Sequence, residues 1–141
     1  MPFDIAKETG TWKASGNSDN YGEMLQKLGI PPSMVPKILE MEYSVQMIVS
    51  GDKFTYKLTK FGMTSVNTFT LGVESEEQDA WGTKRMVTYS LEGDTLVNTY
   101  PSVNGKGLNF HSARRFVDDN TIRTELNVDD MEGWAEVKRV V

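Results

Sequence analysis

Short alternating runs of apolar and polar residues, separated by turn signals, fill this chain from Tyr43 onward. Turns are indicated about every ten residues, for example at Ser50-Gly51-Asp52, Glu92-Gly93-Asp94 and Asn104-Gly105-Lys106. Evenly spaced short strands of this kind predict a sandwich or a barrel. Because a long meander in a small domain must protect its edges, closure into an up-and-down barrel is the expected solution. A barrel of roughly eight or more strands can also keep room for a ligand.

The composition limits the class of protein. The 141 residues predict one domain over residues 1–141, since the chain is too short for a second core. The absence of cysteine excludes disulfides and thiolate zinc sites and favours a reducing, cytoplasmic location. A net charge of -5 without a basic stripe argues against nucleic acid as a partner. No export signal or membrane-spanning segment is expected.

Two short helices are predicted ahead of the strands. The first begins after the capping residues Ser18-Asp19-Asn20 and ends at Gly29. The second begins at Pro31-Pro32-Ser33 and runs to about Glu40. The apolar side of the first helix consists of Tyr21, Met24, Leu25 and Leu28. Because helices of this length are unstable alone, we expect them to pack on the barrel.

The inner face of the predicted barrel mixes apolar side chains with hydroxyl and amide groups. The alternation that indicates this face is clearest over residues 122–128, where Ile122, Leu126 and Val128 share one side. The same alternation in other runs turns inward Met47, Tyr56, Leu58, Val87, Tyr89, Asn98 and Tyr100. Such a face suits a partly hydrated cavity. A filled barrel whose polar groups bond to one another is an equally open alternative.

Several segments, in order along the chain, resemble one known family. They are Gly10-Thr11-Trp12-Lys13, residues 20–30, Ser50-Gly51-Asp52, residues 67–74 and residues 91–97. On these segments the chain resembles the intracellular lipid-binding proteins, the cellular fatty-acid-binding group, along nearly its whole length. Residues 29–32, 69–72 and 137–140 are most similar to the liver-type and ileal bile-acid-binding branches.

The resemblance implies an all-β fold of the calycin type, a ten-stranded antiparallel up-and-down β-barrel (β-clam) capped by a helix-turn-helix. It also implies a soluble intracellular carrier, a monomer without a cofactor, that holds a hydrophobic or amphipathic small molecule and contacts membranes at most transiently. A long-chain fatty acid is the first expectation, and a bile acid, a retinoid or another bulky lipid is compatible with it. The alternative is an interaction or structural barrel with a filled interior and no lipid cargo.

Arg114 is the predicted contact for the acidic group of a ligand. Members of the family usually place a buried arginine in the eighth strand, and residues 113–118 occupy that region here. Alternation turns Arg114 and Phe116 inward and Arg115 outward. A ligand carboxylate would offer Arg114 a bidentate, charge-assisted partner. Two alternatives stay open, namely an internal glutamate partner and a position in water at the barrel end.

The last predicted strand lacks the Arg-x-Tyr pair that members of the family use as a second anchor. Residues 132–139 read Glu-Gly-Trp-Ala-Glu-Val-Lys-Arg and fit two registers. In one register Glu136 faces inward and reaches Arg114. In the other, Ala135 and Val137 form an apolar wall. Either register lacks the two-arginine clamp for fatty acids, which makes a bulkier or less acidic ligand plausible.

A mouth is predicted where the second helix meets two turns. Phe61, Met63 and Trp81 are large apolar residues at turn positions, and we expect them to cover an opening or a ligand tail, with ordinary turn packing as the alternative. Arg85 is a second candidate charge, either facing inward or reaching solvent at this mouth. The complete set of predicted ligand contacts is Arg114, Tyr56, Tyr89, Tyr100, Arg85, Phe61, Met24, Met47, Leu58, Phe116, Trp81 and Glu136.

No catalytic or metal site is predicted. The single histidine, His111, is expected to face outward, and the chain has no cysteine with which to build a metal cluster or a nucleophilic triad. The acidic pairs Glu76-Glu77, Asp118-Asp119 and Asp129-Asp130 are interpreted as solvated turn residues. An enzyme is therefore not expected.

Overall fold

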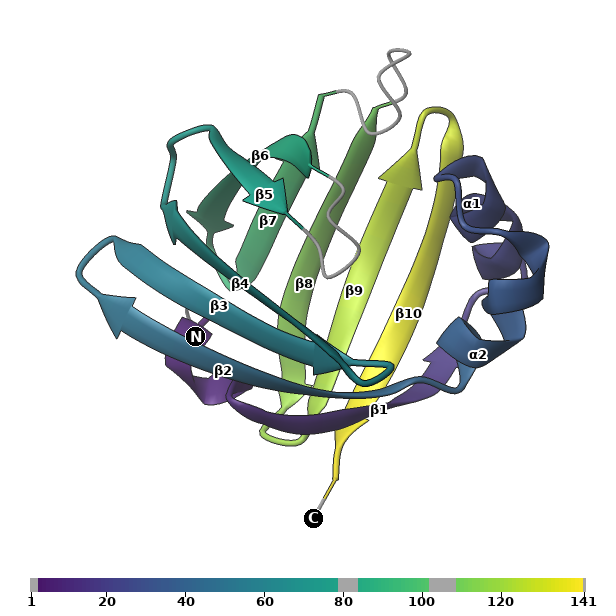
Figure 1. The fold of residues 1–141 in the computed structure, drawn as a ribbon, viewed down its shortest axis with the longest axis horizontal. Helices are drawn as coiled ribbons and strands as arrows, with labels where there is room; N and C mark the ends of the chain where they lie inside the picture. The colour runs from purple at the N-terminus through teal and green to yellow at the C-terminus, as the bar shows by residue number, and fades with distance from the viewer. Residues whose placement is uncertain (1–2, 79–83, 102–108, 141) are drawn as a thin grey trace.

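A computed structural model describes residues 3–78, 84–101 and 109–140. Within these residues, ten antiparallel strands form one curved sheet of order β4-β3-β2-β1-β10-β9-β8-β7-β6-β5. The strands are β1 (Gly10–Asn17), β2 (Glu42–Ser50), β3 (Lys53–Lys60), β4 (Met63–Thr70), β5 (Ser75–Gln78), β6 (Lys84–Glu92), β7 (Thr95–Tyr100), β8 (Phe110–Asp118), β9 (Thr121–Val128) and β10 (Met131–Arg139). Figure 1 shows this sheet wrapped around an interior, with the two helices at one side. The prediction of a ten-stranded antiparallel barrel with a helical cap is confirmed.

The helices α1 (Tyr21–Lys27) and α2 (Val35–Leu39) lie between β1 and β2 in the chain, as predicted. A 3-10 turn, η2 (Pro32–Met34), precedes α2, and another, η1 (Ile5–Glu8), precedes β1. Asn20 occupies the N-cap of α1, but its side-chain amide donates to the carbonyl of Glu132 at 2.7 Å. This predicted capping residue therefore fixes the start of α1 to β10, instead of satisfying the helix itself.

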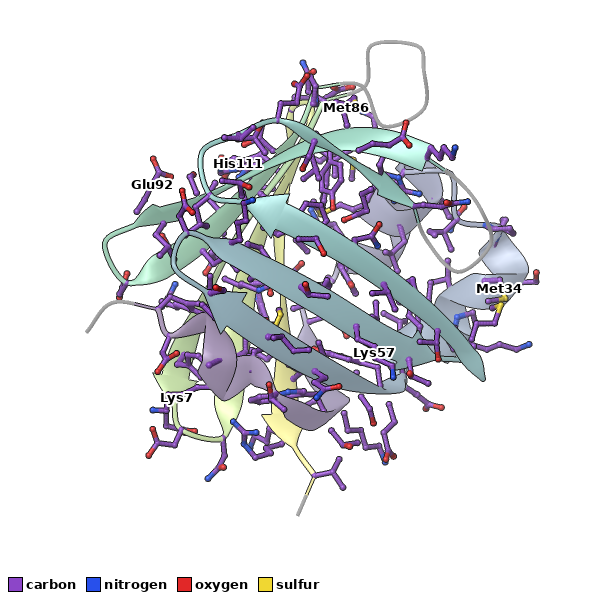
Figure 2. All side chains as sticks on the ribbon, turned by 60° about the vertical axis from the view of Figure 1, so that its left-hand side comes forward. Lys7, Met34, Lys57, Met86, Glu92 and His111 are labelled. Carbon is purple, nitrogen blue, oxygen red and sulfur yellow. The ribbon has the colours of Figure 1, made fainter. Side chains whose placement is uncertain are left out.

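Side-chain alternation separates the barrel interior from its outer surface. On β8, Ser112 is buried, whereas the guanidinium of Arg115 lies 3.8 Å from the carboxylate of Glu125 on the outer face. Figure 2 shows Lys57 on the outer surface of β3, where an ammonium group stays in water. Phe54, the first inward residue of the same strand, is 1% exposed. The alternation predicted for these strands is confirmed.

One end of the barrel is filled by η1 and by aromatic side chains. Phe3 stacks on Phe116 with ring centroids 4.9 Å apart, and the indole N–H of Trp12 donates to the carbonyl of Glu8 at 2.8 Å. Phe3, Ile5 and Trp12 are all buried. Because buried aromatic groups of this size occupy the space that a ligand would need, the open part of the interior lies elsewhere.

The strands β4 and β5 are the two ends of the strand order and form the seam of the barrel. Across this seam the side-chain amide of Asn67 donates to the carbonyl of Gln78 and accepts from its N–H, both at 2.9 Å. A side chain thus takes the place of a backbone ladder. The barrel is thus nearly closed, and among the described residues Asn67 of β4 joins the seam to Gln78 of β5.

Candidate functional site

An internal cavity of about 650 Å³ lies between the helices, the β3–β4 turn and the inward faces of several strands. Its wall includes Leu28, Ile30, Met34 and Ile38 from the helical segment, Phe61 and Met63 from the turn, and Tyr56, Leu58, Asn67, Tyr89, Asn98 and Tyr100 from the strands. The charged residues on the wall are Lys60, Glu77, Arg85 and Arg114. A volume of this size lies within the range of about 300–1,000 Å³ that small-molecule sites occupy.

Most of the predicted ligand contacts lie on this wall. The cavity brings together seven of them, Arg114, Tyr56, Tyr89, Tyr100, Arg85, Phe61 and Leu58. Phe61 adopts a left-handed backbone conformation with a φ of 52° at the turn between β3 and β4, where its side chain borders the helices. The turn that contains Trp81 lies outside the described residues, so the predicted mouth is represented here by the helices and by Phe61 and Met63.

Three predicted contacts belong to the packed core instead of the cavity wall. Met24 packs with Leu126 and Val128, and so fastens α1 to the barrel. Met47 is buried in the main core, and Phe116 stacks on Phe3 at the filled end. All three face inward as predicted, but their neighbours already fill the space around them. Strand and helix periodicity identifies an inward side chain but does not distinguish a packed one from one that borders a void.

Glu136 points to the outer face, and its prediction as an inward ligand contact is wrong. Its carboxylate lies 3.3 Å from the guanidinium of Arg123, which stacks over the ring of Trp134 at 4.2 Å. In the observed register Ala135 stands opposite Thr124 and Val137 opposite the buried Ile122. The apolar wall, which is the second of the two registers predicted for β10, is therefore the one that forms.

Arg114 is paired inside the barrel with a glutamate that sequence reasoning missed. Its Nη2 lies 3.0 Å from Oε2 of Glu8, the last residue of η1. Glu8 is 2% exposed, and the side chain of Arg114 is 14% exposed. Glu136 cannot be this partner because it lies on the opposite face of the sheet. Of the two alternatives left open for Arg114, an internal glutamate partner is the one observed.

Burial and charge act in opposite directions on this pair. Burial raises the pKa of the Glu8 carboxyl, and the charge and hydrogen bond of Arg114 oppose that rise. Burial alone would lower the pKa of Arg114, but the nearby carboxylate of Glu8 raises it above its ordinary value. The Nε of Arg114 has no hydrogen-bond partner among the described residues. The guanidinium is therefore charged and still has a buried donor to offer to a ligand or to water.

A second carboxylate, that of the half-buried Glu77, also lies on the cavity wall. It accepts hydrogen bonds from the hydroxyl of Tyr100 at 3.2 Å and from that of Tyr89 at 3.4 Å. Burial raises the pKa of Glu77, and the charge of Arg85, its register partner on β6, opposes the rise. The interpretation of Glu76-Glu77 as solvated turn residues is therefore wrong for Glu77. Since β5 pairs with β6, an inward Arg85 requires an inward residue opposite it, and this signal could have identified Glu77.

The described residues contain no group of three histidine, cysteine, aspartate or glutamate side chains placed to hold a metal ion. His111 stands opposite Thr99 and Asn127, on the face of β8 that carries Arg115. No helix in the described part of the chain has the length and apolar character needed to cross a bilayer. The cavity offers a ligand apolar side chains, tyrosine hydroxyls, the Arg114–Glu8 ion pair and the charges of Arg85 and Glu77.

Comparison with known proteins gives consistent matches. A model of the family described as "Lipocalin / cytosolic fatty-acid binding protein family" matches residues 7–134. Fatty acid-binding protein 1 of Fasciola gigantica is 32% identical over 120 residues, which cover 85% of this chain and 89% of that protein. The intestinal fatty acid-binding protein of Sus scrofa is 32% identical over 143 residues, which cover 99% of this chain and 97% of that protein.

Solved structures share the fold. A Schistosoma mansoni fatty acid binding protein in complex with arachidonic acid superposes with a TM-score of 0.77 over 97% of this chain and 98% of that one, at 22% identity. A mutant of the fluorescent protein UnaG superposes with the same TM-score and identity over 98% of this chain and 99% of that one. Both are likenesses of fold, a barrel able to surround a small molecule.

Proposed function

The chain belongs to the lipocalin / cytosolic fatty-acid binding protein family, and on that premise we propose that it is a carrier that holds one hydrophobic or amphipathic lipid inside its barrel. The observation that carries this proposal is the internal cavity of about 650 Å³, whose wall combines apolar side chains with a set of polar and charged groups. Enclosure of a lipid tail by such a wall removes apolar surface from water, which is the main driving force for binding.

The polar groups of the cavity give the ligand an orientation. Arg114 and the hydroxyl of Tyr56 lie on the wall together, with the guanidinium 5.8 Å from the tyrosine ring. A headgroup that accepts hydrogen bonds would find its donors there, while its tail contacts Leu58 and the residues of the helical segment. A long-chain fatty acid, or a related lipid with a polar end, fits this division into a polar site and an apolar wall.

The remaining predictions are compatible with this role. We infer a cytoplasmic monomer without a cofactor, which acts as a carrier and not as an enzyme, and which contacts membranes transiently when it exchanges lipid. An unfilled volume of this size favours a carrier over the alternative of a structural barrel with a filled interior. The assignment to a liver-type or ileal bile-acid-binding branch stays a prediction, because the intestinal protein matches 99% of the chain at 32% identity, whereas a liver-type protein of Takifugu rubripes matches 78% of it at 26%.

Native mass spectrometry of the delipidated protein with added oleate tests the proposal. We expect a complex with one oleate, and we expect Leu58→Trp to weaken it at least about tenfold, because the larger side chain fills the cavity. Val66→Trp is the matched control, since Val66 is 59% exposed on the outer face of β4. Equal oleate binding by both variants would place the lipid outside the barrel and contradict the proposal.

A further inference from the structure

We propose that Glu8 is a specificity-determining residue. Because of Glu8, the cavity accepts a lipid headgroup only if binding adds no net negative charge to the site. An uncharged polar lipid then binds directly, and a fatty acid binds together with one proton. This inference rests on the proposed carrier function and deepens it. The observation that carries it is the buried contact of 3.0 Å between Oε2 of Glu8 and Nη2 of Arg114.

Arg114 stands between two chambers of the barrel interior. Together with Tyr56, Leu58 and Lys60, it lines both the cavity of about 650 Å³ and a smaller one of about 190 Å³. Glu8 belongs to the smaller chamber. A headgroup that enters through the larger chamber therefore meets a guanidinium whose charge is already balanced from the other side.

The second inward arginine is balanced in the same way. Arg85 stands opposite Glu77 in the register of β5 and β6, and its charge opposes the rise that burial causes in the pKa of Glu77. The charges of Arg85, Arg114, Glu8 and Glu77 sum to zero. Among the described residues on the walls of the two chambers, Lys60 supplies the remaining charge. Lys60 is half-buried and adds one positive charge, so the single excess cation on the walls lies at this lysine and not at Arg114.

An ionised ligand carboxylate at Arg114 would be a second anion beside Glu8. At a separation of about 6 Å and an effective dielectric constant of about 20, this repulsion makes oleate binding roughly a hundredfold weaker than in the same site with an uncharged residue at position 8. One proton from solvent, bound to Glu8 or to the ligand carboxyl, leaves one cation and one anion in the site and removes the penalty. An alcohol or amide headgroup brings no charge, so its binding requires no proton.

None of the other groups around Glu8 takes up the proton, so it binds either to the Glu8 carboxyl or to the ligand carboxyl. Burial raises the pKa of Tyr43 on β2, of Tyr56 on β3 and of Tyr21 on α1, so that these hydroxyls are neutral near neutral pH. Arg114 of β8 is held in its charged form. Lys60 of β3 is the remaining charged group on the wall of the smaller chamber. The strands β9 and β10 contribute Ile122, Thr124, Leu126, Ala135 and Val137, none of which titrates.

Calorimetric titration of the full chain with oleate and with oleyl alcohol tests this inference. Between about pH 6.5 and 8.5 we expect oleate affinity to fall about tenfold per pH unit, because each oleate brings one proton with it. Repeating the titration in buffers of different ionisation enthalpy should give uptake of one proton per oleate. The affinity for oleyl alcohol should not depend on pH. Oleate binding in this range without proton uptake would overturn the inference.

The variant Glu8→Gln assigns the effect to Glu8. We expect it to bind oleate ten- to a hundredfold more tightly than the parent at pH 8, without proton uptake, and to leave oleyl alcohol affinity within about twofold. Glu136→Gln is the matched control, because Glu136 also pairs with an arginine but on the outer face. Proton uptake that persists in folded Glu8→Gln would overturn the role of Glu8.

Two further results have a fixed meaning. If Glu8→Gln fails to fold, the calorimetry of the parent protein is the test. Uptake of one proton with oleate and none with oleyl alcohol supports the inference, and oleate binding without proton uptake contradicts it. If the parent binds neither lipid, the carrier proposal itself fails and the inference fails with it. That outcome is distinct from tight, pH-independent oleate binding, which overturns the inference and leaves the carrier proposal intact.

Discussion

Arg114 and Glu8 form a pair that is stable only while both members are present. Glu8 is buried and Arg114 nearly so, and across 3.0 Å Arg114 opposes the rise that burial causes in the pKa of Glu8, while Glu8 raises the pKa of Arg114. Removal of one partner from such a pair leaves an uncompensated charge in a site with little access to water. The same contact that biases ligand choice therefore also contributes to folding, and the two effects can be separated by pH.

The variant Arg114→Gln should lower the free energy of unfolding by about 3 kcal/mol at pH 7, because Glu8 loses its cation. Without that cation, burial keeps the folded pKa of Glu8 raised. The native state then holds the proton more tightly than the unfolded chain, so stability falls as pH rises through the folded pKa and returns as pH falls. Urea unfolding at pH 7 and pH 5 measures this, and the double variant Glu8→Gln/Arg114→Gln should recover most of the loss. A deficit equal at both pH values would show that Glu8 is not its cause.

Single-residue features differed in how readily the sequence predicted them. Alternation along β8 placed Arg114 inward, since it lies an even number of residues from Phe110 and Ser112, which the same pattern predicts to face inward. The partner Glu8 was not predicted because it is the last residue of a four-residue 3-10 turn, which is too short to show a periodic pattern of apolar side chains. Glu136 and Ala135 could exchange faces because a shift of one residue reverses a whole strand, and β10 has polar and apolar residues on both sides.

At the scale of elements, strong apolar–polar alternation predicted most of the strands. The strand β5 lacks this alternation and could not be predicted from it. The runs that became β2, β3 and β9 carry clear apolar faces. β5 reads Ser75-Glu76-Glu77-Gln78, which has no apolar residue, and it is a strand because it pairs with β6. Both helices were predictable from capping and proline signals. How α1 packs on the barrel depends on its close approach to Gly133 of β10, and no local sequence pattern predicts a contact between two segments so far apart in the chain.

Gly133→Ala should loosen α1 from the barrel. A Cβ at this position would lie 2.5 Å from Sδ of Met24, 2.7 Å from Oγ of Ser18 and 2.9 Å from Oδ1 of Asn20, so the side chains that join the start of α1 to β10 must move. We expect a loss of about 1–3 kcal/mol in the free energy of unfolding and faster amide exchange in residues 21–27. Gly16→Ala is the control, because its Cβ would meet the Trp134 ring at an ordinary 3.5 Å. Unchanged exchange in α1 of Gly133→Ala would mean that this glycine does not determine the docking.

For the whole molecule, the decisive feature is that the barrel is hollow beside the helices and is filled by packed side chains at the end where η1 lies. The sequence left a filled and a hollow barrel equally open, because cavity volume depends on how all ten strands curve together and not on any one of them. The helical segment borders the cavity, and under the proposed function it is the surface through which we expect lipid to pass to a membrane. Their charge is therefore relevant to the mechanism of transfer.

The surface of the helices carries little positive charge. Lys27 lies 3.6 Å from Asp130 and 3.9 Å from Asp129, and Lys37 is offset by acidic residues nearby in the chain, Glu40 and Glu42. Docking on anionic lipid gains only about 1 kcal/mol per basic residue near the surface, so these helices have little with which to dock. We therefore expect transfer by diffusion through water.

The transfer rate of a fluorescent fatty acid from the protein to vesicles should change less than about twofold as their anionic lipid rises, since electrostatic docking adds little here. The double variant Glu23→Lys/Glu40→Lys supplies the contrast, because it adds two basic residues to the helical segment and should make the rate increase with anionic lipid and fall again with salt. A steep increase for the parent would contradict diffusional transfer. It would mean that the protein collides with the membrane despite the paired lysine, through a surface other than these helices.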